Sequence, residues 1–254
     1  MIVGTIALIT ILFFGGVNDY FLVADLEKGV KEYVIEKDRQ KEILADISLG
    51  KGKIKKVRAM RKESMKELKT VNASRAATRE DFLEIHDDLI TYITNEQSVL
   101  ITFRQNAIAK ITDDEWTQII ELSTQDVEAN KDKLQSEIDK GKLKDPFEEI
   151  EASIIKSISD PAKKEKALDA MMKFKDSFTV FSQKMSEKNV IDHPLLTDKY
   201  ASTEDLLELA EFVNTLRTNT YEAMTEFHFE LLEVTSEKEW ESIIKAFNKI
   251  FKYS

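Results

Sequence analysis

Three histidines, His86, His193 and His228, are the residues best suited to hold a metal or move protons near neutral pH, since the chain contains no cysteine. A carboxylate-bridged di-iron bundle needs a Glu-x-x-His motif on each of two facing helices. The residues three positions before His86 and His228 are Leu83 and Thr225. We therefore predict neither a bundle metal centre nor another cofactor. The absence of cysteine also excludes disulfides, thiolate metal sites and cysteine nucleophiles.

A looser cation site remains conceivable around His86, because acidic residues surround it in the sequence. Glu84, Asp87 and Asp88 are its near neighbours. The competing interpretation is an ordinary solvated acidic helix face, which such runs usually form, and we favour it. The sequence also contains no phosphate-binding glycine loop and no Gly-x-Ser-x-Gly turn. We expect a protein that is not an enzyme.

A cluster of threonine and asparagine residues occurs twice in the chain. Thr and Asn are weak helix formers, so their presence at the same positions of two helices calls for a physical cause. One cause is a surface for a ligand or protein partner, and the other is a polar contact between helices that fixes their register. Glu96, with Thr220 at the matching position, is expected in the same polar layer. The six candidate residues are Thr91, Thr94, Asn95, Thr215, Thr218 and Asn219.

A basic run begins at Lys51 and contains no acidic residue up to Lys62. Such a run can bind an anionic lipid surface, at about 1 kcal/mol per basic residue. The alternative is a solvated helix face that complements an acidic body. The candidates for contact with an anionic surface are Lys53, Lys55, Lys56, Arg58, Arg61 and Lys62.

Composition narrows the fold class. The chain has 254 residues, of which 7 are glycine and 3 are proline, too few for the many turns of a sheet protein. Residues 1–70 carry 14 basic and 10 acidic side chains, a net charge of +4. Because the whole chain has a net charge of −10, residues 71–254 carry −14. A body that acidic repels nucleic acid, whose binding depends on phosphate neutralisation. We predict an all-α protein without a nucleic-acid partner.

Residues 2–17 are uncharged and mostly apolar. A helix of this length reaches about 24 Å, somewhat less than the roughly 30 Å hydrocarbon core of a bilayer. An uncleaved signal anchor, a cleaved signal peptide and a buried core helix all remain open. We favour the anchor, because no Lys or Arg precedes the apolar run and no clean small-x-small cleavage site follows it. This segment predicts contact with a membrane and a location at or beyond it, in the periplasm or cell envelope.

The chain also contains an internal repeat. Residues 77–120 align without a gap with residues 201–244, at an offset of 124. Thirteen of the 44 positions are identical, and they include Trp116 and Trp240. Each copy contains two hydroxyl-x-x-acid patterns that are typical of helix starts, at Thr78, Thr112, Ser202 and Ser236. We interpret the match as a tandem duplication.

The spacing of apolar residues predicts the helices. Helices are expected near 79–110 and 203–234. In each, seven positions separated alternately by three and four residues form a heptad seam, from Phe82 to Phe103 in the first helix and from Leu206 to Phe227 in the second. Short helices are expected over 22–36 and 146–159, and long helices over 37–76 and 161–188. Gly50 and Gly52 either break the first long helix or weaken it.

The predicted architecture is a tandem duplication of a four-helix unit, built as heptad-packed helical bundles, behind an N-terminal apolar helix. Its divisions are residues 1–20 as anchor or signal peptide, 21–140 as the first repeat and 141–254 as the second. The predicted function is that of a membrane-anchored or exported binding scaffold for a protein partner at the cell envelope. The alternative is a periplasmic stress chaperone or a metal-responsive helical bundle.

Overall fold

The computed structural model describes residues 26–124, 146–190 and 193–249, and within these ranges the protein is entirely helical, without strands. The helices are α2 (Leu26–Tyr33), α3 (Lys37–Ala73), α4 (Arg79–Ile108), α6 (Pro146–Ser157), α7 (Pro161–Glu187), α8 (Pro194–Thr197), α9 (Thr203–Val234) and α10 (Glu237–Phe247). Residues 113–124 are also helical. The prediction of an all-α fold is confirmed for this part of the chain.

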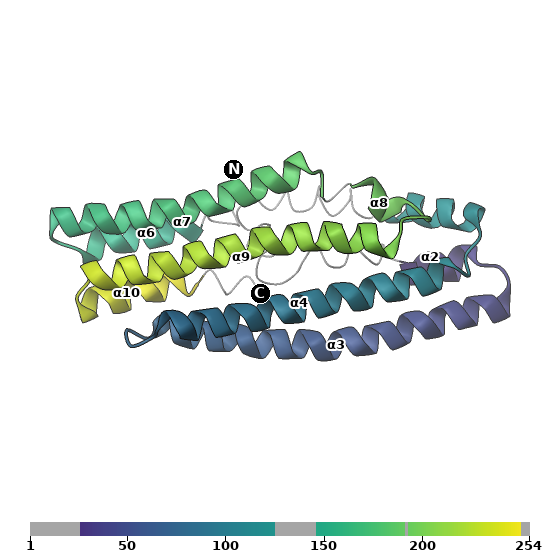
Figure 1. Ribbon diagram of the computed structural model, residues 1–254, viewed down its shortest axis with the longest axis horizontal. Helices are drawn as coiled ribbons and strands as arrows, with labels where there is room; N and C mark the ends of the chain where they lie inside the picture. Colours follow the sequence, from purple (N-terminus) through teal and green to yellow (C-terminus); the bar gives the residue numbers. More distant parts are fainter. Residues whose placement is uncertain (1–25, 125–145, 191–192, 250–254) are drawn as a thin grey trace.

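Two long hairpins make up the body of the molecule. Helix α3 pairs with α4, α7 pairs with α9, and the two hairpins meet where α4 packs antiparallel to α9 (Figure 1). Helix α2 and residues 113–124 lie at one end of this elongated body, and α6 and α10 lie at the other. Most of the apolar core is one continuous cluster, and a smaller cluster under α2 includes Trp116 and Ile119.

Local capping explains why the helices begin where the sequence predicted. The Thr78 hydroxyl accepts from the backbone N–H of Asp81, whose carboxylate accepts from the Thr78 N–H at 2.7 Å. The same reciprocal arrangement joins Ser236 and Glu239 at the start of α10. Asp160 caps α7, with Pro161 at the first helical position, where proline loses no helical hydrogen bond. These side chains satisfy backbone donors that the first turn of a helix leaves free.

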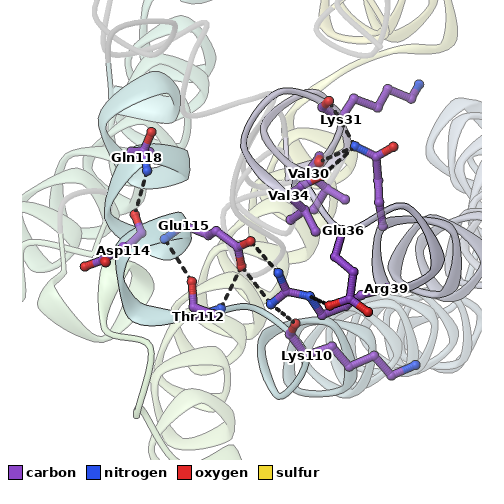
Figure 2. Close-up of polar contacts among 11 residues, drawn as sticks. Val30, Lys31, Val34, Glu36, Arg39, Lys110, Thr112, Asp114, Glu115 and Gln118 are labelled. Carbon is purple, nitrogen blue, oxygen red and sulfur yellow. Dashed lines mark hydrogen bonds and ion pairs between the residues drawn. The ribbon is translucent and has the colours of Figure 1, made fainter.

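A partly buried ion pair closes the α2 end of the body. Arg39 of α3 donates to both carboxylate oxygens of Glu115, at 2.6 and 3.0 Å, and to the carbonyl of Lys110 (Figure 2). Glu115 also accepts from the backbone N–H of Thr112, at 2.9 Å. One carboxylate therefore caps a helix and fastens that helix to α3.

Each tryptophan joins opposite parts of the chain. Trp116 Nε1 donates to the carbonyl of Thr197 at 2.9 Å, and Trp240 Nε1 donates to the carbonyl of Ala73 at 3.3 Å. Both tryptophans are buried. The aromatic rings thus cover the ends of the core.

None of the helices in the described ranges is long and apolar enough to cross a bilayer. The segment 2–17, predicted to be an anchor or a signal, lies outside the described residues. Residues 22–25 of the short helix predicted over 22–36 lie outside them as well.

Helix α3 runs without a break through both of its central glycines, so these residues do not interrupt it. A Cβ atom at Gly50 would lie 2.7 Å from the Phe103 ring, whereas a Cβ at Gly52 would have no atom within 4 Å. Gly50 therefore serves a close helix approach, and Gly52 only lowers helix propensity.

We expect Gly52→Ala to stabilise the protein by about 0.5–1 kcal/mol through helix propensity. Gly50→Ala gains the same propensity but must displace the buried ring of Phe103, so we expect a net loss of about 1–2 kcal/mol. Urea unfolding followed by circular dichroism measures both. Equal stabilisation by the two substitutions would show that α3 and α4 are not held this close.

Candidate functional site

The centre of the α4/α9 interface is a buried polar network. Asn214 Nδ2 donates to Gln97 Oε1 at 2.7 Å and to the Thr94 hydroxyl at 3.1 Å, and Gln97 donates back to Asn214. The buried Arg217 guanidinium donates to the same Asn214 side chain. The bonds of Asn214 to Gln97 and Thr94 cross between the helices, so they fix the register in which the two hairpins meet.

A buried ion cluster lies beside this network. Glu96 is completely buried and accepts from Arg58 Nε at 2.5 Å and from the buried Arg61, both on α3. Burial lowers the pKa of Arg217 to about 10, and the charge of Glu96 acts in the opposite direction. Arg217 therefore remains charged at neutral pH. Glu96 is the carboxylate that interacts with the guanidinium groups of Arg58, Arg61 and Arg217.

Two histidines occupy an aromatic cluster towards the α10 end of the same interface. His86 stacks on Tyr221 at 4.9 Å, and His228 contacts Phe82 edge-on at 4.7 Å. The Nε2 atoms of both histidines are buried and find no hydrogen-bond partner among the described residues. Burial lowers the pKa of each imidazole to about 4 and raises that of Tyr221 to about 12, so all three side chains are neutral at pH 7.

A groove of about 400 Å³ opens between α4 and α9, and we call it the α4/α9 groove. Its lining residues are Ile90, Thr94, Gln97, Leu207, Ala210, Glu211, Asn214, Thr215 and Thr218. The hollow has a steric cause. In the repeat alignment, Ala210 corresponds to His86 and Gln97 corresponds to Tyr221. The stacked rings of His86 and Tyr221 fill the space that the smaller pair leaves open. Smaller side chains on one half of the interface therefore leave it open.

Another hollow, of about 510 Å³, lies at the start of α9 beside Lys199 and Tyr200. The Tyr200 hydroxyl contacts both oxygens of Asp113 at 2.9 Å, and Lys199 pairs with the same carboxylate. Because these polar groups bind one another, the hollow presents mainly backbone and aliphatic surface.

All six residues of the predicted threonine–asparagine cluster are exposed: Thr91, Thr94, Asn95, Thr215, Thr218 and Asn219. Their assignment to a buried contact between helices is wrong, apart from the single bond that Thr94 accepts from Asn214. They lie one or two positions away from the seam. Thr94, Thr215 and Thr218 line the α4/α9 groove.

Glu96 is buried apart from the exposed threonine–asparagine cluster, and it binds two arginines of the basic run. Arg61, predicted to contact an anionic surface, is instead buried, and the half-buried Arg58 binds the same carboxylate. These two assignments fail because Glu96 draws the guanidinium groups inward. Lys53 lies over the Phe103 ring at 5.4 Å, and its neighbours Lys55, Lys56 and Lys62 are exposed.

The acidic residues around His86 do not converge on it. Glu84, Asp87 and Asp88 are exposed, whereas His86 points into the core. Over the described ranges, no three side chains of the His, Asp or Glu type come together as metal ligands. The looser cation site considered from the sequence is therefore not formed by these residues.

Sequence reasoning missed the residues that bind across the interface, chiefly Gln97, Asn214, Arg217 and Tyr221. The available signal was a run of polar residues next to the heptad positions of both helices. That signal does not say which polar residues face inward, because the answer depends on how far the partner helix is rotated.

An exposed row of residues runs along both helices, which we call the shared stripe. On α4 it comprises Glu80, Leu83, Asp87, Thr91 and Thr94, and on α9 it comprises Glu204, Leu207, Glu211, Thr215 and Thr218. Four of the five pairs are identical, and the fifth pairs Asp with Glu. By contrast, only one of the seven seam pairs, Phe103 and Phe227, is identical. The match between α4 and α9 is thus stronger on the surface than in the core.

Comparisons with protein-family models, with curated proteins and with solved structures give no match to this chain.

We expect Glu96→Gln to destabilise the protein by about 3–5 kcal/mol, because it leaves Arg61 and Arg217 buried without a carboxylate. Glu84→Gln, at an exposed position of the same helix, should change the free energy of unfolding by less than about 0.5 kcal/mol. Urea unfolding provides the measurement. Replacing both partners, as in Glu96→Leu with Arg61→Leu, should recover much of the loss, and a double variant as unstable as Glu96→Gln would contradict the pairing.

We also expect stability to fall between pH 6.5 and pH 4. Unfolded histidine takes up a proton near pH 6.5, whereas the two buried imidazoles do so only near pH 4. The stabilisation is therefore complete above pH 6.5 and is lost as the pH falls, by about 2 kcal/mol per histidine at pH 5. His86→Phe should remove about half of this pH dependence, and the control His193→Asn should leave most of it. Urea midpoints measured from pH 7 to pH 5 test this, and an unchanged slope for His86→Phe would refute it.

Proposed function

We propose that the chain is a tandem duplication of a four-helix unit, packed through heptad seams, and that it acts as a non-catalytic scaffold that binds a protein partner. The units are residues 21–140 and 141–254. Residues 2–17 tether the protein to a membrane or direct its export, which places it at the cell envelope. The observation that carries the binding role is the open α4/α9 groove, which is lined by most of the α9 row of the shared stripe and by Thr94 of the α4 row.

Reciprocal contacts support the duplication. Trp116 binds the carbonyl of residue 197, and Trp240 binds the carbonyl of residue 73. The tryptophans are 124 residues apart, and so are the two carbonyls. Each half therefore makes the same bond to the other half, as expected for two copies related by an approximate two-fold axis.

The interiors of the two halves support it as well. Gly50 lies against Phe103, and at the same offset Phe174 stacks on Phe227 at 5.7 Å. Arg39 binds Glu115, and at the same offset Lys163 helps to lower the pKa of Glu239. Different side chains thus occupy equivalent places, as in copies that have diverged.

The heptad seams have matching burial in the two long helices. Phe82, Ile85 and Leu89 are buried on α4, and so are Leu206, Leu209 and Val213 on α9. This pattern is typical of helices that pack along a seam of period 3.5.

A rigid body with an exposed polar groove suits recognition of a protein. The groove residues Thr94, Thr215 and Thr218 offer hydroxyl groups at an open surface, and Leu207 adds apolar area. A binding surface commonly combines a few apolar contacts with placed polar groups. These features favour a scaffold over a chemical role.

The tether is tested by cell fractionation. We expect the full chain to sediment with membranes and to need detergent for release, and the variant lacking residues 2–17 to be soluble with an unchanged circular dichroism spectrum. N-terminal sequencing of the native protein separates an anchor from a cleaved signal. A full chain that retains its N-terminus and stays soluble without detergent would contradict both.

The binding role is tested by capture of partners from membranes of the source cell after cross-linking. We expect a small set of partners, which is lost on substitution of groove residues such as Thr94 and Thr218 by Trp in a folded protein. A broad set of unrelated clients would instead favour the chaperone alternative. Matched bulky substitutions at exposed positions of α7, such as Lys166→Trp, serve as the control.

A further inference from the structure

The shared stripe is the part of the long helices in which the two halves differ least, although exposed positions are under the weakest packing constraint. The seam positions must fill a core, yet they differ at six of seven pairs. The stripe positions are exposed and need fill nothing, yet four of five pairs are identical. Stability does not account for this, since exposed substitutions usually change it by less than about 0.5 kcal/mol. An interaction made by both stripes does account for it.

The order of chemical groups along each stripe is acid, leucine, acid, threonine, threonine. The positions are spaced by three, four, four and three residues, so they form one row on the helix surface. The row covers 14 residue steps, or about 21 Å of helix. Leu83 and Leu207 keep 56% and 39% of their surface exposed between acidic neighbours, so each row offers one apolar side chain flanked by carboxylates.

The antiparallel packing of α4 and α9 makes the two rows run in opposite directions, and the α4/α9 groove is lined by four residues of the α9 row and by Thr94 of the α4 row. The threonines of both helices come together near its middle, where Thr94, Thr215 and Thr218 line it. The acidic and leucine positions lie towards opposite ends. The surface therefore presents the same groups twice, related by the approximate two-fold axis of the fold.

The negative charge of this surface favours a partner with positive charge. Between residues 80 and 103 helix α4 has no basic residue, and the only basic residue of α9 is the buried Arg217. Arg79, at the start of α4, is paired with Glu226. A second copy of this surface would place carboxylates against carboxylates, which is unfavourable. A partner with Lys or Arg beside an apolar side chain matches the charges of Asp87 and Glu211 and covers the leucines.

We propose that the shared stripe, with the α4/α9 groove on its α9 half, binds a two-fold symmetric protein partner that lays one basic, amphipathic segment on the row of each helix. This inference rests on the proposed binding function and names the class of partner. The symmetry follows from the repeated order of groups, because an asymmetric ligand would use the two halves differently and would not favour the same residues in both. The basic character follows from the carboxylates, and the amphipathic character follows from the exposed leucines.

The test uses a designed probe on the full-length protein. The probe is an 18-residue helical peptide of Ala, Leu and Lys, with a leucine flanked by lysines at spacings of three and four, used both as a single peptide and as a covalently joined antiparallel pair. Fluorescence anisotropy gives the affinities. We expect the pair to bind at least tenfold more tightly than the single peptide, because both stripes are engaged at once.

Two matched double variants separate this site from general attraction to an acidic protein. Asp87→Asn with Glu211→Gln removes two stripe charges, and Glu151→Gln with Glu165→Gln removes two exposed charges on α6 and α7. We expect the first to weaken binding of the joined pair at least tenfold and the second less than twofold, with unchanged circular dichroism spectra. Leu83→Ala with Leu207→Ala should also weaken it, without any change of charge.

Equal weakening by the two charge variants would overturn the proposal, as would equal affinity for the single and the joined peptide. Concentration-dependent dimerisation of the protein in sedimentation, abolished by the stripe variants, would assign the surface to a second copy and would also overturn it. If a captured native partner keeps its affinity for the Asp87→Asn, Glu211→Gln variant, the scaffold function stands and this inference fails.

Discussion

The antiparallel contact between α4 and α9 is the constraint on which the rest of the structure depends. Each of these helices is half of a hairpin, and their contact joins the hairpins through the middle of the molecule. Charge is buried beside this contact: Glu96 of α4 binds Arg61 of α3, and its charge also acts on the buried Arg217 of α9. Removing charges from water is unfavourable unless they are paired and hydrogen-bonded, so only one rotation and one register of the helices is acceptable. The buried network therefore restricts where the surface groups of both helices can lie.

The groove follows from that restriction together with a difference between the two halves. Where the buried residues are His86 and Tyr221, their stacked rings fill the interface. Where they are Ala210 and Gln97, the same helix spacing leaves a hollow. The stacked rings of His86 and Tyr221 and the bonds of Asn214 to Gln97 and Thr94 lie at the same interface, so they set the spacing of α4 and α9 beside the smaller side chains. An open site can thus persist at the surface of a well-packed bundle.

Most of the helical architecture could be predicted from the sequence because its signals are local. A capping pair such as Thr78 and Asp81 acts within one turn, and the four long helices begin at the expected residues. The orientation of individual polar side chains could not be predicted in the same way. Arg58 and Arg61 have the same type of sequence context as Lys55 and Lys56, but only the arginines face Glu96 on another helix. The information that separates them lies in the packing of α3 on α4.

The candidate site was predicted only in part, because the repeat indicates positions along a helix but not which side chains face the partner helix. The repeat singled out Thr91, Thr94 and Asn95 with their copies, and these positions do lie together beside the groove or next to it. Their burial was predicted wrongly, because polarity in mid-helix is compatible with an interface and equally with an exposed row. Asn214 and Gln97, which form the interface bond, have no identical counterpart in the other half, so the repeat gave no reason to select them.

The proposed duplication rests on equivalent contacts in the two halves and not on identity of their core residues. Gly50 against Phe103 and Phe174 against Phe227 fill equivalent places with very different volumes. The small Gly50 lets α3 approach α4, whereas the large Phe174 fills a wider gap between α7 and α9. A core can therefore change its side chains while it keeps its arrangement of helices. An exposed row has no such compensation available, since no neighbouring side chain can make up for a lost surface group. Identity at exposed positions therefore points to an external requirement, and in this protein those positions border the α4/α9 groove.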